Sequence, residues 1–106
     1  MRLLTLRERE PRATIDFETF SVADIKRVGA HLYAKHPTTR ILCLYYKLPG
    51  GELKRWLASM PSIGLERSPL PRDLFRWIES GGLVEAHNAG FEIAIWREQC
   101  EKKMRW

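Results

Sequence analysis

The stretch from Arg40 to Leu48 constrains the fold most, because it contains six consecutive apolar residues, Ile-Leu-Cys-Leu-Tyr-Tyr. A short apolar run of this kind is typical of a strand inside a sheet, covered on both faces. The sequence Pro49-Gly50-Gly51 follows and predicts a turn, after which residues 52–57 return as a hairpin strand. The chain therefore has to build a sheet, and other elements have to cover it.

The remaining elements alternate between strand and helix patterns. In chain order we expect strands at 13–18, 40–48, 52–57 and 83–87, and helices at 22–28, 71–80 and 91–104. Ser21 and Asp24 form a capping-box pattern for the first helix, and Gly29 supplies its stop. Pro71 opens the second helix. Residues 30–39 read as a loop with a single helical turn. The order predicts an α/β or α+β sheet with flanking helices.

Length and charge narrow the class of protein. The chain has 106 residues, of which 44% are hydrophobic, enough for one compact domain. Its net charge of +5 favours a polyanionic partner such as nucleic acid, although many basic domains bind none. No apolar run is long enough to span a membrane, and the N-terminus lacks the apolar core of a signal peptide.

The cysteines and the first twelve residues carry weaker signals. Cys43 and Cys100 show no zinc-site or disulfide spacing, so a reducing cytoplasm is the simplest expected location. Residues 1–12 mix leucines with charged side chains, and Pro11 ends any regular element there; the segment fits either a leader or an edge strand. Residues 13–106 form the expected domain.

Two acids in the first strand suggest a site. In Thr14-Ile15-Asp16-Phe17-Glu18-Thr19, alternation along a strand places Asp16 and Glu18 on one face, roughly 7 Å apart. A hard cation such as Mg²⁺ or Mn²⁺ would offset the cost of holding these carboxylates together. The alternative is an ordinary half-exposed strand with two solvated acids, since D-x-E is a short and common pattern.

A second stretch, His87-Asn88-Ala89-Gly90-Phe91-Glu92, favours the cation site over the two solvated acids. Together with Asp16-Phe17-Glu18-Thr19 it resembles the DEDD superfamily of 3′–5′ exonucleases, whose first motif is D-x-E-T and whose second has the form H-N-x-x-F-D. Glu92 stands where most members carry Asp. The surrounding sequence is most similar to the proofreading exonuclease domain of phage-type family-A DNA polymerases, from about residue 14 onward.

The resemblance implies a ribonuclease H-like mixed sheet and two-metal hydrolysis of the 3′-terminal phosphodiester of single-stranded DNA, with Mg²⁺ or Mn²⁺. By position, Asp16 would bridge the two ions, Glu18 would hold the ion that activates water, and Glu92 would reach the other ion. Thr19 and Phe20 would lie beside the 3′-terminal nucleotide. Asn88 and Phe91, in the second motif, would support the site or line the pocket for that nucleotide. Without a metal, Glu92 is also explained as an acid favoured by the macrodipole at a helix N-terminus.

The family's third motif supplies a last metal-binding Asp, preceded by a Tyr or His. Residues 93–106 contain no Asp, His or Tyr, so the resemblance implies a domain truncated before this motif. Two readings follow: an exonuclease or its N-terminal fragment, and an inactive nucleic-acid-binding or interaction module derived from the same fold. A homo-oligomer or a completing chain would be able to supply the missing groups.

The tryptophans and the basic residues carry further expectations. Trp77 and Trp96 have the spacing of core or groove-lining residues, whereas Trp106 is expected to be exposed if the family's next segment is missing. Basic side chains gather near both ends of the chain. They are explained either as solvated helix faces or, if the ends meet in space, as a phosphate track.

Overall fold

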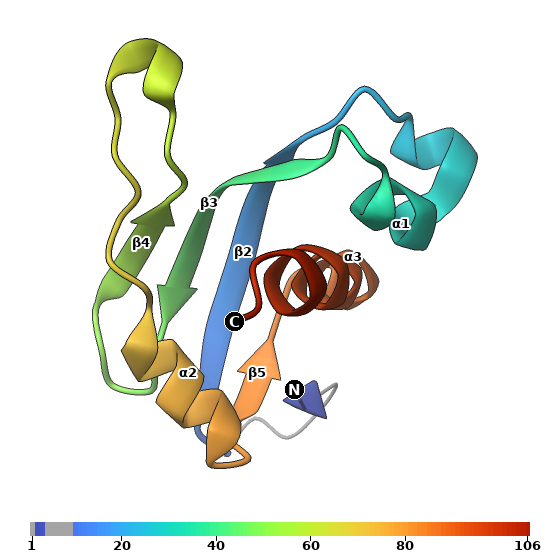
Figure 1. The fold of residues 1–106 in the computed structure, drawn as a ribbon. Coiled ribbons are helices and arrows are strands. Elements are labelled where there is room, and N and C mark those ends of the chain that lie inside the picture. Colours follow the sequence, from blue (N-terminus) through green and yellow to red (C-terminus); the bar gives the residue numbers. More distant parts are fainter. Residues whose placement is uncertain (1, 4–9) are drawn as a thin grey trace.

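A computed structural model describes residues 2–3 and 10–106 (Figure 1). A mixed sheet forms the centre, with strand order β1-β5-β2-β3-β4. Its strands are β1 (Arg2–Leu3), β2 (Arg12–Phe20), β3 (Arg40–Lys47), β4 (Leu53–Leu57) and β5 (Leu83–Glu85). The strands β2, β3 and β4 are antiparallel neighbours, while β5 runs parallel to both β2 and β1. The protein is thus an α/β fold whose sheet is compatible with the ribonuclease H-like arrangement.

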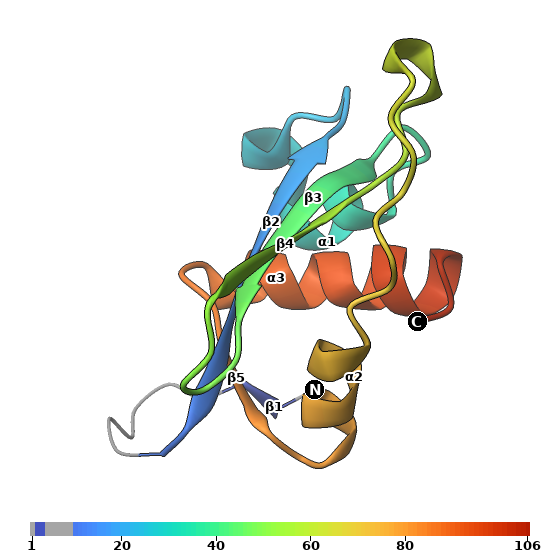
Figure 2. The ribbon, with the colours of Figure 1, turned by 90° about the vertical axis from the view of Figure 1, so that its left-hand side faces the viewer.

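The helices are α1 (Ile25–Lys35), α2 (Arg72–Glu79) and α3 (Ala89–Ile95), which continues directly as the π-helix η2 (Trp96–Lys103). A short 3₁₀ turn, η1 (Pro61–Ile63), lies in the projecting loop after β4 (Figure 1). Viewed from the side, α2 and the C-terminal part of η2 lie on the same side of the sheet (Figure 2). No helix in the described part of the chain combines the length and apolarity needed to cross a membrane.

Alternation along β2 divides the sheet into a packed face and a polar face. Ala13, Ile15 and Phe17 are buried, while the residues between them are exposed. The antiparallel register places Phe17 opposite Leu44 on β3. The packed face therefore carries the core, and the other face of β2 is open to solvent around Asp16 and Glu18.

The strand β3 is covered along most of its length, as expected. Ile41, Cys43, Leu44 and Tyr46 are buried, and Leu42 and Tyr45 are half-buried. The departure from a fully covered strand that lies nearest the acids is Tyr45, the register partner of Asp16. The hairpin from β3 to β4 agrees with the prediction from the sequence.

The chain around the first helix agrees with its prediction up to Gly29 and departs from it afterwards. The helix α1 begins at Ile25, and the carboxylate of Asp24 accepts the capping hydrogen bond from the backbone N–H of Lys26. Gly29, with φ 83° and ψ 166°, leaves the helical conformation and ends the first helical segment as predicted, but a second segment follows it to Lys35, where a loop with one helical turn was expected. Long-range contacts hold this second part, because Ala34 is fully buried and its carbonyl accepts a hydrogen bond from the Gln99 side chain.

The N-terminal segment lies partly outside the described residues. Arg2 and Leu3 form an edge strand beside β5, which agrees with one of the two interpretations of residues 1–12. The prediction for residues 1 and 4–9 lies outside the described range. The central strand begins at Arg12, directly after Pro11.

The end of the chain packs against an aromatic cluster. Trp106 was expected to be exposed, but it is half-buried, and its ring centroid lies 4.9 Å from that of Trp56 and 5.1 Å from that of Phe75. A backbone hydrogen bond from Trp106 to the carbonyl of Cys100 turns the last residues back onto the fold. The prediction of exposure was therefore wrong, because these rings provide a packing surface that the linear sequence does not reveal. Trp96 is buried and Trp77 half-buried, as expected.

Candidate acidic site

The site lies where β5 separates from β2. The strand β5 pairs with β2 only as far as Thr14, which is the partner of Glu85. Beyond that point the chain turns through Asn88 into α3, and α3 contacts β2. Figure 1 shows α3 beside β2, just past the end of β5. A helix therefore takes the place of a neighbouring strand along this part of the central strand.

Glu92 makes the contact that joins the two motifs. Its side-chain Oε2 accepts a hydrogen bond of 3.2 Å from the backbone N–H of Phe17. Glu92 is only 2% exposed, whereas Asp16 and Glu18, on either side of Phe17, project into solvent. The structure thus brings the carboxylate of the second motif against the backbone between the two acids of the first.

The electrostatics of Glu92 reflect this position. Burial is the largest cause that raises the pKa of Glu92; with the lowering effect of the Phe17 N–H and the raising effect of the negative charges of Asp16 and Glu18 included, the pKa is about 7. A single backbone donor is a weak compensation for a buried carboxylate. Near neutral pH the side chain is therefore poised between its charged and neutral forms, a property that functional acids often share.

The donor chemistry fits a hard cation, although the side chains do not form a closed ligand shell. Three carboxylates without thiolate or imidazole are the ligand type that Mg²⁺ and Mn²⁺ prefer. Among residues 2–3 and 10–106, however, no group of three or more Asp, Glu, His or Cys side chains is arranged to hold a metal ion. The Glu92 carboxylate is directed at the strand backbone, while Asp16 and Glu18 extend into solvent.

Thr19 and Phe20 follow an irregularity in the pairing of β2 with β3, between Glu18 and Thr19. The Thr19 hydroxyl lies 2.8 Å from the hydroxyl of Tyr33 on α1. Phe20 is 47% exposed, and the guanidinium of Arg40 lies 5.3 Å from its ring centroid. Phe20 thus offers an accessible aromatic surface with a cation beside it, while Thr19 ties the end of β2 to α1.

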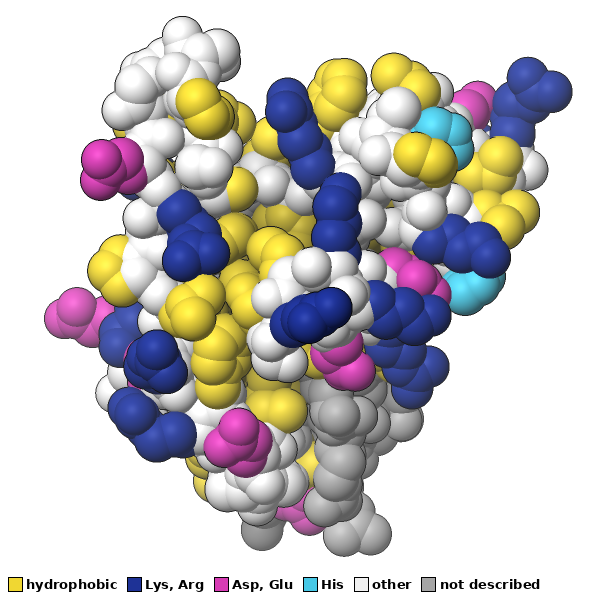
Figure 3. Space-filling model, in the orientation of Figure 1, with side chains coloured by type: hydrophobic (Ala, Val, Ile, Leu, Met, Phe, Trp, Pro, Cys, Tyr) yellow, Lys and Arg dark blue, Asp and Glu magenta, His cyan; other side chains and the backbone are white. Residues whose placement is uncertain are grey.

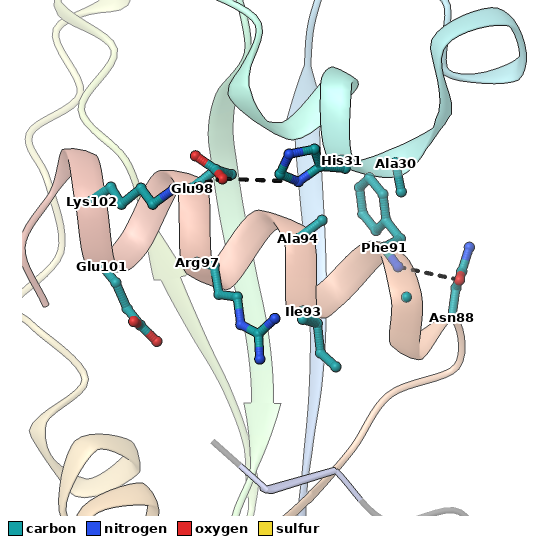
Figure 4. Close-up of a pocket in the computed structure, with 11 residues that line it drawn as sticks. Ala30, His31, Asn88, Phe91, Ile93, Ala94, Arg97, Glu98, Glu101 and Lys102 are labelled. Carbon is teal, nitrogen blue, oxygen red and sulfur yellow. Dashed lines mark hydrogen bonds and ion pairs between the residues drawn. The ribbon is translucent and has the colours of Figure 1, made fainter.

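Asn88 and Phe91 lie at the N-terminal end of α3. The Asn88 side chain caps α3 by accepting a 3.4 Å hydrogen bond from the backbone N–H of Phe91. The Phe91 ring packs against Tyr33, with 6.0 Å between centroids. Both residues line one end of an open groove of about 690 Å³ between α1 and the last helix, whereas Glu92 does not line it (Figure 4).

Sequence reasoning missed Tyr33 and Arg40 as members of this region. Tyr33 links Thr19 to Phe91 because it lies on the second part of α1, which was expected to be a loop. A helical pattern continuing past Gly29, with Ala30, Tyr33 and Ala34 spaced by three and four residues, was the available signal. Arg40 offered none, because only the pairing of β2 with β3 brings it opposite Phe20.

Comparisons with protein-family models, with characterised proteins and with solved structures gave no match to this chain.

Proposed function

We propose that this chain is a metal-dependent 3′–5′ exonuclease domain of the DNA-polymerase proofreading type, or the N-terminal part of one. The observation that carries the proposal is the hydrogen bond from Phe17 N–H to Glu92, which joins two acidic motifs more than 70 residues apart. Glu92 is buried and close enough to Asp16 and Glu18 for both charges to raise its pKa. Such a group of anions is costly unless a cation accompanies it.

The chain's own residues would divide the work as follows. Asp16 and Glu18 would hold divalent ions on the open face of β2, and Glu92 would complete the set from α3. When bound, such ions supply a polarised water and neutralise charge on the phosphate in the transition state. The exposed ring of Phe20 would stack on the terminal base, and Asn88 and Phe91 would line the approach of the nucleotide.

The proposed site lacks one of the acidic ligands that the resemblance implies. The family resemblance implies a fourth acidic ligand, and residues 93–106 contain no Asp. That ligand would have to come from another segment, a second copy or a completing chain. The geometry of the three acids also favours a second candidate function, an inactive nucleic-acid-binding module, because they do not form a closed shell among the described residues.

The deciding experiment incubates the purified protein with a 5′-labelled single-stranded DNA and Mn²⁺. The exonuclease proposal predicts products shortened stepwise from the 3′ end, lost in Asp16→Ala and Glu92→Gln and retained in Glu52→Gln. Glu52 is a suitable control because it is an exposed glutamate in the β3–β4 turn. Intact DNA at high protein concentration would overturn the exonuclease proposal for this chain, and a retarded but uncut DNA would support the binding module.

The same sample tests the need for a second copy. Light scattering gives the mass in solution, and the activity can be followed as the protein is diluted. A monomer that cleaves DNA with a rate proportional to its concentration would contradict a shared site.

A further inference from the structure

A second pocket lies away from the acidic site, between α2 and the last helix. It has a volume of about 220 Å³, and its lining consists of Phe75, Ile78 and Glu79 from α2, Trp96 and Glu101 from η2, and Trp106. Hydrophobic side chains gather between α2 and the last helix on the face seen in Figure 3. The volume is below the range typical of drug-sized ligands, so it suits a single small group.

Three aromatic rings form the walls of this pocket. The ring centroids of Phe75, Trp96 and Trp106 lie 5.1, 5.8 and 6.5 Å apart in pairs, and the planes are inclined to one another by 54 to 74°. The three rings are thus in tilted or edge-to-face contact with one another, and all three line the pocket. The negative electrostatic potential of aromatic ring faces attracts cations.

Two carboxylates add charge of the same sign. Glu79 and Glu101 both line the pocket and are exposed. Figure 4 shows Glu101 pointing away from His31, toward the side on which α2 lies. Within residues 2–3 and 10–106, neither glutamate has an ion-pair partner, whereas Glu98 on the same helix is paired with Lys102. The pocket thus has negative charge that the described chain does not neutralise.

We propose that this pocket binds a small organic cation of the quaternary ammonium class. Alkyl groups around the charge would contact Ile78 and the rings, and the charge itself would be stabilised by the ring faces and the two carboxylates. A compact inorganic cation fits less well, because it would have to lose its water shell to reach aromatic walls. This binding site is separate from the proposed nuclease site and does not depend on it.

The test uses choline and its neutral isostere, 3,3-dimethyl-1-butanol, which has the same shape without the charge. Each is titrated into ¹⁵N-labelled protein up to about 50 mM, where a ligand with a millimolar Kd saturates. The four tryptophan indole N–H signals are followed, with each assigned from a Trp→Phe variant. We expect choline to shift the Trp106 signal and leave Trp77 unchanged, because Trp77 donates to the Leu83 carbonyl outside the pocket.

Variants separate charge recognition from simple apolar binding. Glu101→Gln should weaken choline binding about 3- to 10-fold, as expected for loss of one partly solvated charge. Glu52→Gln, which makes the same change outside the pocket, should leave the affinity unaltered. Trp106→Leu should weaken binding by at least about fivefold. This affinity is interpreted only if the indole signals of the other tryptophans show that the variant is folded.

Three results would overturn the proposal. The first is an absence of any choline-dependent shift at Trp106. The second is equal binding of choline and the neutral isostere. The third is an affinity unchanged when both Glu79→Gln and Glu101→Gln are present, since the second and third results would each show a pocket that does not recognise charge.

Discussion

Two helix-borne acids in this protein contact the sheet in opposite ways. Asp73 on α2 accepts hydrogen bonds from the Tyr46 hydroxyl, the Lys54 ammonium and the Leu74 backbone N–H. Glu92 on α3 accepts one, from Phe17. Burial raises the pKa of Asp73, but its three donors outweigh burial and the pKa is lowered overall, whereas that of Glu92 is raised to about 7.

This difference separates a carboxylate that stabilises the fold from one that the fold tolerates. Asp73 is compensated by a cation and a hydroxyl, so its charge is favourable in the folded state. Glu92 is surrounded by two further acids and has no side-chain donor among the described residues. An under-compensated buried acid beside other acids is a feature of binding and catalytic sites more than of packing.

Substitution of Asp73, the acid whose charge is compensated, should have the largest effect on stability. Asp73→Ala leaves the buried Tyr46 hydroxyl and the exposed Lys54 ammonium without their acceptor, so we expect a loss of about 2–3 kcal/mol in the free energy of unfolding at pH 7. Urea denaturation followed by tryptophan fluorescence measures it. Because the folded pKa of Asp73 lies below its unfolded value, the loss should shrink as the pH falls below about 4. An equal loss at pH 3 and pH 7 would contradict the role of its charge.

Substitution of Glu92, the under-compensated acid, should increase the free energy of unfolding instead of lowering it. The pKa of Glu92 rises from 4.5 in the unfolded chain to about 7, so ionisation costs stability as the pH increases through this window. Glu92→Gln keeps an oxygen acceptor for Phe17 N–H, and we expect it to stabilise the protein by roughly 2 kcal/mol at pH 8. At pH 4 the variant and the natural protein should differ little.

Glu98→Gln serves as the control for this comparison. Glu98 lies on the same continuous helix but is paired with Lys102, and its pKa is lowered. The substitution should therefore produce no stabilisation at pH 8. A destabilised Glu92→Gln at pH 8 would show that its carboxylate is compensated by contacts other than the Phe17 N–H.

The smallest effect concerns DNA contact rather than stability. Phe20 is 47% exposed and its ring has the Arg40 guanidinium over it, so Phe20→Ala should change the free energy of unfolding by less than about 1 kcal/mol. If the ring stacks on a base, single-stranded DNA binding should weaken about fivefold, measured by fluorescence anisotropy with a short oligonucleotide. Val22→Ala, at a neighbouring exposed apolar residue, should leave binding unchanged. Equal affinities for both variants would remove Phe20 from the proposed DNA contact.

The sequence predicted the fold well where patterns are local. The alternation in β2, the apolar run of β3 and the turn at Pro49-Gly50-Gly51 each specify one element, and all three occur. Gly29 does end the first helical segment as predicted, but the second segment of α1 was not predicted, because the packing of Ala34 and the hydrogen bond from Gln99 involve elements distant in the sequence. The prediction that Trp106 is exposed was wrong for the same reason, since its partners lie on elements distant in the sequence.

In the candidate site, too, the features set by local patterns were predictable and those set by contacts between distant elements were not. The two acids of β2 are on one face because a strand alternates, which the sequence alone establishes. The position of Glu92 against Phe17 depends on how early β5 ends, because a longer β5 would occupy that edge of β2. The pairing of Thr19 with Tyr33 likewise depends on the unpredicted part of α1.

The central claim is that Asp16, Glu18 and Glu92 bind a divalent cation together. A ¹³C NMR titration of the Glu92 carboxyl group, with and without saturating Mg²⁺, tests it directly. Without Mg²⁺ we expect a pKa of about 7, and with Mg²⁺ a value below the ordinary 4.5, because a bound cation favours the ionised form. A pKa near 7 that does not respond to Mg²⁺ would contradict the account.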